Sequence, residues 1–479
     1  MPESWVNLGE RLGADLHLEL AGAGGKRAAL STALRDAVRS GRLAPGTRLP
    51  PYRSLAADLG LARNTVADAY AELVAEGWLT AVQGSGTRVA DRAEPVTRAR
   101  TPKKAPGGVA GLRHDLRQGR PDVTAFPRTE WLAAARRALA VAPHDAFGPG
   151  DPRGRRELRE ALAGYLARVR GVRTSPDRIV VCSGFAHALR LLFPAVLPGP
   201  LAVESYGLAF HRSIFAAAKV DTIPLAVDEN GARVAELAAH GDVRTVLLTP
   251  AHQFPIGGPL HHDRRTAVVD RVRATGGLLV EDDYDGEFRY DRKPVGAVQG
   301  LDPEHVVYAG SVSKSLSPAL RLGWLVLPER LVDAVLAVKG EREAWAGVLD
   351  QLTLAAFVES GAYDKHIRRM RQRYRRRRDR LVEALATRAP HVEPTGVAAG
   401  LHAVLRLPPG TEKSALKAAA WQGLALDGLA AFRHPAAPLS TESTMSTMDG
   451  LVVGYAAPSE PAYAAAVDAL CRALPPGVG

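Results

Sequence analysis

The stretch Gly310–Trp324 reads GSVSKSLSPALRLGW and carries one lysine, Lys314, among small and hydroxyl-bearing residues. The apolar run HVVYA at 305–309 precedes it and predicts a buried strand that ends in a Gly-Ser turn. We therefore expect the Lys314 amine at the carboxyl end of a strand, the edge where open α/β sheets bind ligands. A lysine in this position can condense with an aldehyde, although the same short motif is also typical of solvated surface lysines.

The neighbours of Lys314 suit a phosphate group. Ser311 and Ser313 leave room beside the amine and offer hydroxyl groups. Arg321, seven residues after the lysine, supplies a guanidinium group whose two parallel N–H bonds match a phosphate. The stretch is therefore a candidate site for an aldehyde that also bears a phosphate.

Length and composition limit the class of protein. The chain has 479 residues, 46% of them hydrophobic, so two or three domains with a large core are expected. Its two cysteines, Cys182 and Cys471, lie far apart in apolar segments, which excludes a disulfide framework and favours a reducing compartment. Residues 1–20 carry charges without an apolar core, and no run is long enough to span a bilayer, so we expect a cytoplasmic protein without membrane contact. The net charge of +11 favours an anionic partner.

The N-terminal region predicts a winged helix-turn-helix. The run AALSTALRDAVRSGRL after Arg27 has helical periodicity and contains a glycine near its end, and YRSLAADL at 52–59 predicts a second short helix. A third helix starts at 62–65 after a tight glycine turn and continues through VADAYAELVAEGW. WLTAV at 78–82, a QGSG turn and TRVA at 87–90 predict a β-hairpin, the wing.

Residues 40–90, SGRLAPGTRLPPYRSLAADLGLARNTVADAYAELVAEGWLTAVQGSGTRVA, resemble the DNA-binding domain of the GntR family along nearly their whole length. The resemblance implies a double-stranded DNA operator, contacted by Arg53, Arg63, Asn64, Thr65, Gly84, Ser85 and Gly86. Arg63 can reach a guanine edge with two hydrogen bonds, and Thr65 at a helix N-terminus suits a phosphate. The alternative is that Arg63 and Asn64 only cap a helix in a small interaction module.

The segment 92–114, RAEPVTRARTPKKAPGGVAGLRH, is rich in Pro, Gly, Lys and Arg, has no periodicity and is interpreted as a flexible tether. We therefore divide the chain into a DNA-binding domain at 1–92, a flexible basic linker at 93–115 and an α/β domain at 116–479. The run KHIRRMRQRYRRRRDR at 365–380 is the densest in basic residues. Its apolar positions predict a solvated surface helix, and a second path for DNA is the alternative.

From residue 116 onward, predicted strands and helices alternate as in doubly wound α/β folds. RIVVC at 178–182 predicts a strand followed by a Ser-Gly turn and a helix, so the free amides of Gly184, Phe185 and Ala186 would point at an anion. TVLLT at 245–249 and GLLV at 277–280 predict two further strands, and the second leads into the acidic run EDDYD.

One cofactor, pyridoxal phosphate, accounts for these strand ends together. Lys314 would hold it as an internal aldimine, Asp282 would pair with the ring nitrogen, and Tyr284 would donate to the phenolic oxygen. Ser311 and Arg321, together with the amides after residue 183, would hold the phosphate. A magnesium site is the alternative for the acidic run, although no phosphate-loop motif accompanies it.

The order TPAHQFPIGG, VEDDYDGEFRY and SVSKSLSPALRLGW resembles the fold-type I aminotransferase-like domain of the MocR/GabR-type regulators, a subfamily of the GntR family. FGPGDPRGRRELREALAGYLARVRGV and SGFAHALRLLF extend the resemblance, which covers almost the whole chain. It implies a pyridoxal-phosphate-dependent transcriptional regulator, a homodimer in which each DNA-binding domain is tethered to the large domain. Within TPAHQFPIGG, it implies cofactor contacts by His252 and Gln253.

Two departures from the family pattern bear on activity. Glu204–Leu208 reads ESYGL where the family commonly has an acidic residue, Pro, Gly and an aromatic, which leaves Tyr206 as the candidate for stacking on the cofactor ring. Gly450 stands where aminotransferases place the arginine that grips the substrate carboxylate, and Arg433 is the candidate substitute. We therefore expect a sensor of pyridoxal phosphate, or of an amine or amino acid, that acts through Lys314 rather than by turnover. The alternatives are an active aminotransferase with a fused DNA-binding domain and a DNA-binding protein with an empty dimerisation scaffold.

Overall fold

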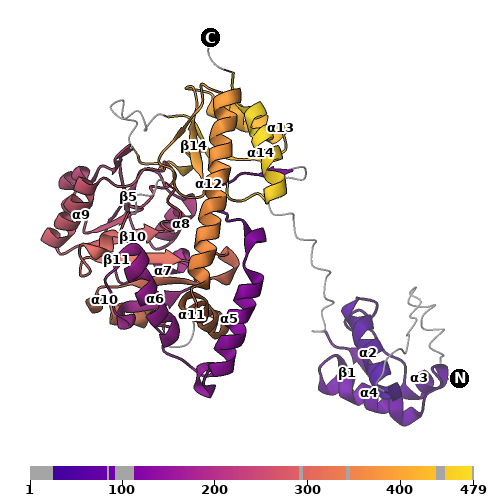
Figure 1. Cartoon of the computed structure of the whole chain (residues 1–479). Helices are drawn as coiled ribbons and strands as arrows, with labels where there is room; N and C mark the ends of the chain where they lie inside the picture. The colour runs from indigo at the N-terminus through magenta and orange to yellow at the C-terminus, as the bar shows by residue number, and fades with distance from the viewer. Residues whose placement is uncertain are drawn as a thin grey trace. The chain divides into compact units, whose positions relative to one another are not determined.

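The computed structural model describes residues 25–82, 86–91, 113–290, 295–340, 346–437 and 448–476. The chain divides into two compact units, Met1–Ala110 and Gly111–Gly479 (Figure 1). Gly84 and Ser85 of the predicted wing, and nearly all of the predicted linker, lie outside the described residues. Each unit is described by itself.

The first unit is the predicted winged helix-turn-helix. It contains α2 (Gly25–Arg39), α3 (Tyr52–Asp58), α4 (Arg63–Ala75), β1 (Leu79–Val82) and β2 (Gly86–Val89). The two strands pair antiparallel, with Leu79 opposite Val89. The apolar positions expected from the helical periodicity are buried, among them Leu30 and Leu34 on α2 and Val66 on α4. These positions form a separate small core that holds the three helices against the hairpin.

A seven-stranded sheet forms the centre of the second unit. Its order is β4 (Ile179–Cys182), β12 (Gly323–Val326), β11 (Val306–Ser311), β10 (Leu278–Asp283), β9 (Thr245–Leu248), β5 (Leu201–Glu204), β6 (Thr222–Leu225). β12 runs antiparallel to both of its neighbours. This strand departs from the parallel doubly wound pattern because the chain returns after β11 through a loop rather than through a crossover helix.

Helices cover both faces of the sheet, so its central strands read as continuous apolar runs. One face packs against α7 (Phe185–Leu192), α8 (Ala209–Ala217) and α10 (Glu329–Lys339). The other face packs against α6 (Arg156–Arg170), α9 (His262–Thr275) and α11 (Val348–Glu359). Alternation along the strands decides which face a side chain joins: Val307 of β11 packs with the first group and Tyr308 with the second.

The C-terminal part adds a second sheet behind the long helix α12 (Ala362–Arg388), drawn in orange in Figure 1. That sheet has the order β13 (Glu393–Thr395), β14 (Ala403–Arg406), β17 (Gly450–Val453), β16 (Asp427–Gly428). The remaining helices and strands are α5 (Arg128–Val141), α13 (Glu412–Trp421), α14 (Glu460–Ala473), β3 (His114–Asp115), β7 (Val227–Asp228), β8 (Gly231–Ala232) and β15 (Leu424–Ala425). Short 3-10 helices are η1 (Val123–Ala125), η2 (His144–Phe147), η3 (Pro176–Arg178), η4 (Val234–Ala239), η5 (Val298–Gly300), η6 (Pro318–Leu320) and η7 (Leu429–Phe432).

Helix α12 buries one face, as its sequence pattern indicates. Ile367, Met370 and Tyr374 are buried on it. Arg377 is also fully buried, where its guanidinium donates to Asp122 at 2.9 Å. No helix in the described part of the chain is both long and apolar enough to cross a membrane.

Candidate functional site

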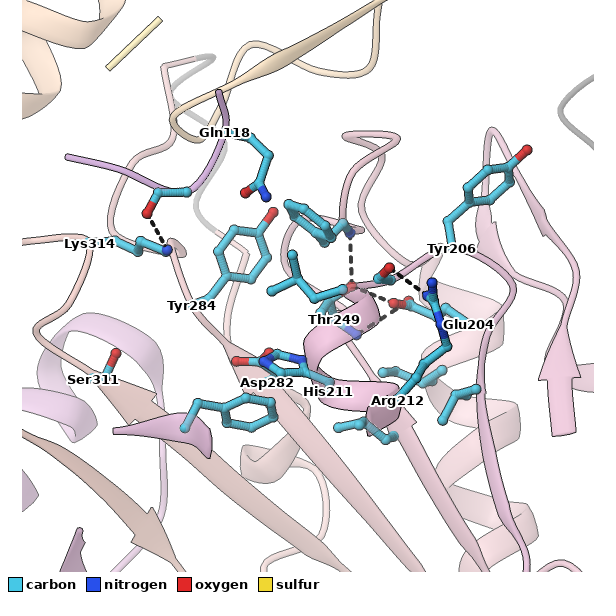
Figure 2. A pocket seen from close by; sticks show the side chains of 18 of the residues that line it. Gln118, Glu204, Tyr206, His211, Arg212, Thr249, Asp282, Tyr284, Ser311 and Lys314 are labelled. Carbon is cyan, nitrogen blue, oxygen red and sulfur yellow. Dashed lines mark hydrogen bonds between the residues drawn. The ribbon is translucent and has the colours of Figure 1, made fainter. Parts of the chain in front are cut away.

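The predicted lysine, aspartate and tyrosine meet at one edge of the central sheet. Lys314 lies in the loop after β11, and Asp282 and Tyr284 lie at the end of β10. The two strands are parallel neighbours, with Asp282 opposite Ala309. All three side chains line a cavity of ≈ 190 Å³ (Figure 2). This confirms the placement at a strand edge, which the apolar run before Lys314 predicts.

Lys314 extends its amine into this cavity. Its Nζ donates to the carbonyl oxygen of Gly119 at 2.5 Å (Figure 2). Burial lowers the pKa of Lys314 from its ordinary value, and the nearby carboxylates of Asp285 and Asp282 oppose that change. A lowered pKa increases the fraction of neutral amine, which is the form that attacks an aldehyde.

Asp282 is a buried acid at the end of β10. It is 8% exposed and forms no hydrogen bond or ion pair with any described residue. Burial, reinforced by Asp283, raises the pKa of Asp282 well above its usual range, and Lys314 opposes the change. A buried charge needs a paired charge or hydrogen bonds. The carboxylate therefore fits a protonated ring nitrogen, which supplies both.

The other carboxylates of the acidic run turn to separate partners. Glu281 accepts two backbone N–H groups at 2.9 and 3.0 Å. Asp283 pairs with Arg170 at 2.6 Å, and Asp285 lies 2.9 Å from His252. These side chains diverge, and among the described residues the acidic run does not form a cluster of three or more metal-ligating groups.

The predicted phosphate-binding residues lie near the start of α7. Gly184 precedes this helix with a φ of +85°, and no side chain caps the free N–H groups of the first turn. The Arg321 guanidinium donates to Ser183, and a Cβ added at Gly184 would lie 3.5 Å from one of its nitrogens. Arg321 itself has a φ of +52°, a left-handed conformation that few residues other than glycine adopt. The Arg321 guanidinium therefore lies beside the free N–H groups at the start of α7, an arrangement that suits an anion.

The other residues predicted to bind a phosphate differ in whether they line the cavity. Ser311, Ser313 and Phe185 line the cavity. Ala186 lies in the first turn of α7, where its backbone N–H has no intrahelical acceptor. Gly184, Ala186 and Arg321 are not among the described residues that line the cavity, so of the predicted phosphate-binding residues only Ser311, Ser313 and Phe185 reach it. The chemistry of these donors suits a phosphate near an aldehyde at Lys314.

His252 and Gln253 do not reach the cavity wall. His252 is 2% exposed, and its Nδ1 lies 2.9 Å from the hydroxyl oxygen of Tyr284. Gln253 turns into its own loop, where its amide donates to the carbonyl oxygen of Phe254 at 2.7 Å and accepts from the N–H of Ile256 at 3.1 Å. His252 therefore contacts two residues that line the cavity, Tyr284 and His402, rather than the cavity itself.

Tyr206 and Arg433 lie beside each other, joined by an isolated antiparallel bridge. Tyr206 lines the cavity, but its phenol points away from Lys314 and Asp282 (Figure 2). Arg433 is not among the residues that line the cavity in the described part of the chain, and its guanidinium donates to the carbonyl oxygen of Ala437 at 2.6 Å.

Several residues that line the cavity are not predicted from the sequence. Arg212 of α8 donates to the carbonyl oxygens of Gly207 at 2.7 Å and Phe432 at 3.0 Å, and it forms no ion pair with a described residue. His211 beside it has a pKa lowered to about 4 by burial, with further lowering by Lys314 and Arg212. The pattern around α8 only predicts an amphipathic helix, so no sequence signal separates these two residues from ordinary surface positions.

Glu204 is a further buried acid at the cavity. Its carboxylate accepts the hydroxyl of Thr249 at 2.6 Å and the backbone N–H of the same residue at 3.3 Å. Burial raises the pKa of Glu204 to about 7, because hydrogen bonds only partly offset the loss of solvation. These two hydrogen bonds join the ends of β5 and β9 at the cavity wall.

In the first unit, the candidate DNA-binding residues lie at the helix-turn-helix. Arg63 and Asn64 are exposed at the start of α4, and Thr65 is half-buried beside them. Arg53 is exposed on α3. Gly86 opens β2 with a φ of +85°, and a Cβ there would lie 3.2 Å from the side chain of Arg48.

Comparison with known proteins agrees with both halves of this description. Residues 26–89 match the family described as bacterial regulatory proteins, gntR family. Residues 115–438 match aminotransferase class I and II. The chain is 33% identical to the uncharacterized HTH-type transcriptional regulator YhdI of Bacillus subtilis over 90% of this chain and 92% of that protein. It is 32% identical to the probable rhizopine catabolism regulatory protein MocR of Rhizobium meliloti, over 72% of this chain and 74% of that protein.

The chain belongs to the MocR-type branch of the GntR family. A further relative is the HTH-type pyridoxine biosynthesis transcriptional regulator PdxR of Corynebacterium glutamicum, 33% identical over 78% of this chain and 82% of that protein. Among solved structures, a kynurenine aminotransferase of Pyrococcus horikoshii matches with a TM-score of 0.67 and 26% identity over 76% of this chain and 91% of that chain. The predicted combination of a GntR-type domain with a fold-type I aminotransferase-like domain is therefore confirmed.

The family match also supports pyridoxal phosphate as the cofactor of this MocR-type chain. The Pyrococcus structure was determined in complex with PMP, the amine form of that cofactor. Three features agree with this assignment: Asp282 has no hydrogen-bond or ion-pair partner among the described residues, Lys314 is enclosed, and the N–H groups at the start of α7 are uncapped.

Proposed function

We propose that this MocR-type protein binds operator DNA through α4 and the wing and carries pyridoxal phosphate covalently on Lys314. The observation that supports it most strongly is the convergence of Lys314, Asp282 and Tyr284 on one cavity. The domain division at 1–92, 93–115 and 116–479 belongs to the same proposal. A cytoplasmic homodimer is the state in which we expect it to work.

Each residue of the site has a distinct task. Bound there, pyridoxal phosphate supplies an electrophilic carbon and a ring that withdraws electrons. Asp282 holds the ring nitrogen in its protonated form, and Tyr284 donates to the phenolic oxygen. Arg321 and the first N–H groups of α7 hold the phosphate, so Lys314 remains directed at the aldehyde carbon.

We further propose that the site senses a ligand rather than sustaining transamination. Turnover requires both an amino acid and a keto acid to be held with the reacting bond aligned to the ring. Leu208 stands where the family commonly has a stacking aromatic, and Gly450 is buried in β17 without a side chain to offer. Sensing requires only that a ligand interact differently with two states of the protein.

The first prediction separates the sensor from the alternative of an active aminotransferase. When the cofactor-loaded protein is mixed with amino acids and amines, we expect a change in visible absorbance and in operator affinity without sustained release of keto acid. Absorbance spectroscopy, keto acid assays over many equivalents and DNA-binding titrations measure the three quantities. Multiple turnover at ordinary transaminase rates would establish the enzyme instead.

The second prediction concerns the class of effector. Arg212 is a cation at the cavity wall whose charge no described acid balances, so a carboxylate on the effector suits it better than an amine alone. Arg212→Gln is expected to weaken the absorbance response to amino acids about tenfold, since a hydrogen bond to a charged group contributes about 1.5 to 3 kcal/mol. The response to amines that lack a carboxylate should not change.

Arg433→Gln is the matched comparison, because Arg433 also donates to a backbone carbonyl but does not line the cavity among described residues. If Arg433→Gln produces the selective loss and Arg212→Gln does not, Arg433 grips the effector. Equal losses for amines and amino acids in Arg212→Gln point to a structural role, since its bonds hold residues 207 and 432 together.

A further inference from the structure

His252 connects the cavity to a buried carboxylate behind it. Its Nδ1 lies 2.9 Å from the Tyr284 hydroxyl oxygen and 2.9 Å from Oδ2 of Asp285. The His252 and Asp285 side chains are 2% and 1% exposed. The imidazole and phenol rings are stacked, with centroids 6.0 Å apart. Tyr284 lines the cavity whereas His252 does not, so the order of contact is Asp285, His252, Tyr284, cavity.

The direction of these hydrogen bonds follows from counting protons. A carboxylate only accepts, so the contact between Nδ1 and Asp285 requires the proton of the imidazole to lie on Nδ1. A protonated Nδ1 cannot accept a hydrogen bond from the Tyr284 hydroxyl. The hydroxyl oxygen of Tyr284 therefore accepts a hydrogen bond from the Nδ1–H group of His252 instead. The proton of the Tyr284 hydroxyl then remains available for an acceptor in the cavity.

Neighbouring residues pack closely against His252 and Asp285. Gly400 has a φ of +71°, and a Cβ there would lie 2.3 Å from Cε1 of His252 and 2.5 Å from Oδ2 of Asp285. His402 stands on the other side, its ring centroid 5.3 Å from that of His252, and its Nε2 donates to the carbonyl oxygen of Pro255 at 3.0 Å. Burial lowers the pKa of His402 to about 3, so this second imidazole is neutral and adds no charge beside the pair.

We propose that His252, oriented by Asp285, is a positioning residue that keeps the Tyr284 hydroxyl a hydrogen-bond donor toward the cavity. This rests on the proposed function, because the acceptor is the phenolic oxygen of pyridoxal phosphate. In this proposal His252 contacts Tyr284, whereas the family resemblance implies that His252 contacts the cofactor directly. His252 and Asp285 fix the direction in which the Tyr284 hydroxyl donates, and Tyr284 alone contacts the cofactor.

Asp285→Asn tests the proposal with little change in shape. An asparagine amide can donate to Nδ1, which moves the imidazole proton to Nε2 and turns Nδ1 into an acceptor for the Tyr284 hydroxyl. The hydroxyl is then directed away from the cavity. We expect the dissociation constant for pyridoxal phosphate to rise about tenfold, as it should in Tyr284→Phe, because both variants lose one hydrogen bond to a charged oxygen.

The pH midpoint of the bound cofactor's absorbance gives a second readout, because the direction of its shift in Asp285→Asn separates loss of the donor from simple loss of a charge. A donor at the phenolic oxygen stabilises the negative charge that remains when the Lys314 linkage loses its proton, so losing the donor moves the midpoint to higher pH. Simple loss of a negative charge acts in the opposite direction, since Asp285 and Asp282 both raise the pKa of Lys314. The other titratable groups facing Tyr284, namely Asp282, Glu204 and Tyr455, are the same in the variant and the wild type, so their contributions cancel when the two midpoints are compared.

Asp302→Asn is the control, because Asp302 Oδ2 lies 3.0 Å from Nδ1 of His305 in an aspartate–histidine pair that does not line the cavity and that also includes Arg273, 2.9 Å from the same oxygen. It should leave both the dissociation constant and the midpoint as in the wild type. His252→Asn, which retains an N–H donor, should preserve more affinity than His252→Leu. A midpoint that falls in Asp285→Asn, or an unchanged dissociation constant there while Tyr284→Phe loses affinity, overturns the inference. Failure of the wild-type protein to bind pyridoxal phosphate overturns the proposed function itself.

Discussion

Lys314→Ala is expected to abolish the covalent attachment of pyridoxal phosphate and the visible absorbance of the purified protein. Only a neutral amine within reach of the aldehyde can form the bond, and Lys314 is the cavity lysine whose pKa is lowered by burial. Asp282 and Arg321 remain in the variant, so weaker noncovalent binding of the cofactor should persist. Absorbance spectra and the mass of the intact protein after borohydride reduction measure the loss.

The competing amine in this experiment is Lys339. It is also buried, and burial lowers its pKa to about 8, but its Nζ donates to the carbonyl oxygen of Val181 at 2.7 Å and lies outside the cavity lining. Peptide mapping of the reduced wild-type protein should therefore label Lys314 and leave Lys339 unmodified. Label on Lys339, or colour retained in Lys314→Ala, contradicts the assignment.

Arg63→Ala is expected to weaken binding to the operator far more than binding to random DNA. The exposed guanidinium at the start of α4 can form two hydrogen bonds to a guanine edge, and losing such a base contact costs about 1 to 3 kcal/mol of specific binding. Titrations of both DNAs at one fixed salt concentration measure the ratio, because the phosphate contribution depends on salt.

Arg48→Ala provides the comparison for Arg63. Arg48 is exposed beside the first residue of the wing strand β2, where a contact with the DNA backbone is the expected role. Its loss should lower the affinity for operator and random DNA alike. Equal losses on both DNAs in Arg63→Ala would refute base readout by that residue.

The strand ends of this protein are predictable because they depend on local patterns. An apolar run followed by a small-residue turn marks the end of β11 before Lys314, and a similar run leads to Asp282 and Tyr284. Parallel strands bring their carboxyl ends together, so the meeting of these residues needs no knowledge of distant contacts. The alternation of the same strands also anticipates a sheet covered on both faces.

The rest of the site depends on contacts between distant segments. Asp285 meets His252 thirty-three positions away, and Thr249 meets Glu204 forty-five positions away. Neither pair has a periodic signature, because each is selected by tertiary packing. Arg212 looks like any charged residue of an amphipathic helix until the fold places it at the cavity. The antiparallel direction of β12 likewise depends on how the loop after Lys314 closes.

The separate small core of the first unit has an evolutionary consequence. Within the described part of the chain, this core draws its buried residues only from positions between 30 and 90. Substitutions at distant sites without shared partners contribute nearly additively to stability. Substitutions in α4 that change its operator preference should therefore leave the folding free energy of the large unit unchanged. Recombination can therefore join one inherited large unit to a different helix-turn-helix unit without changing the core of either.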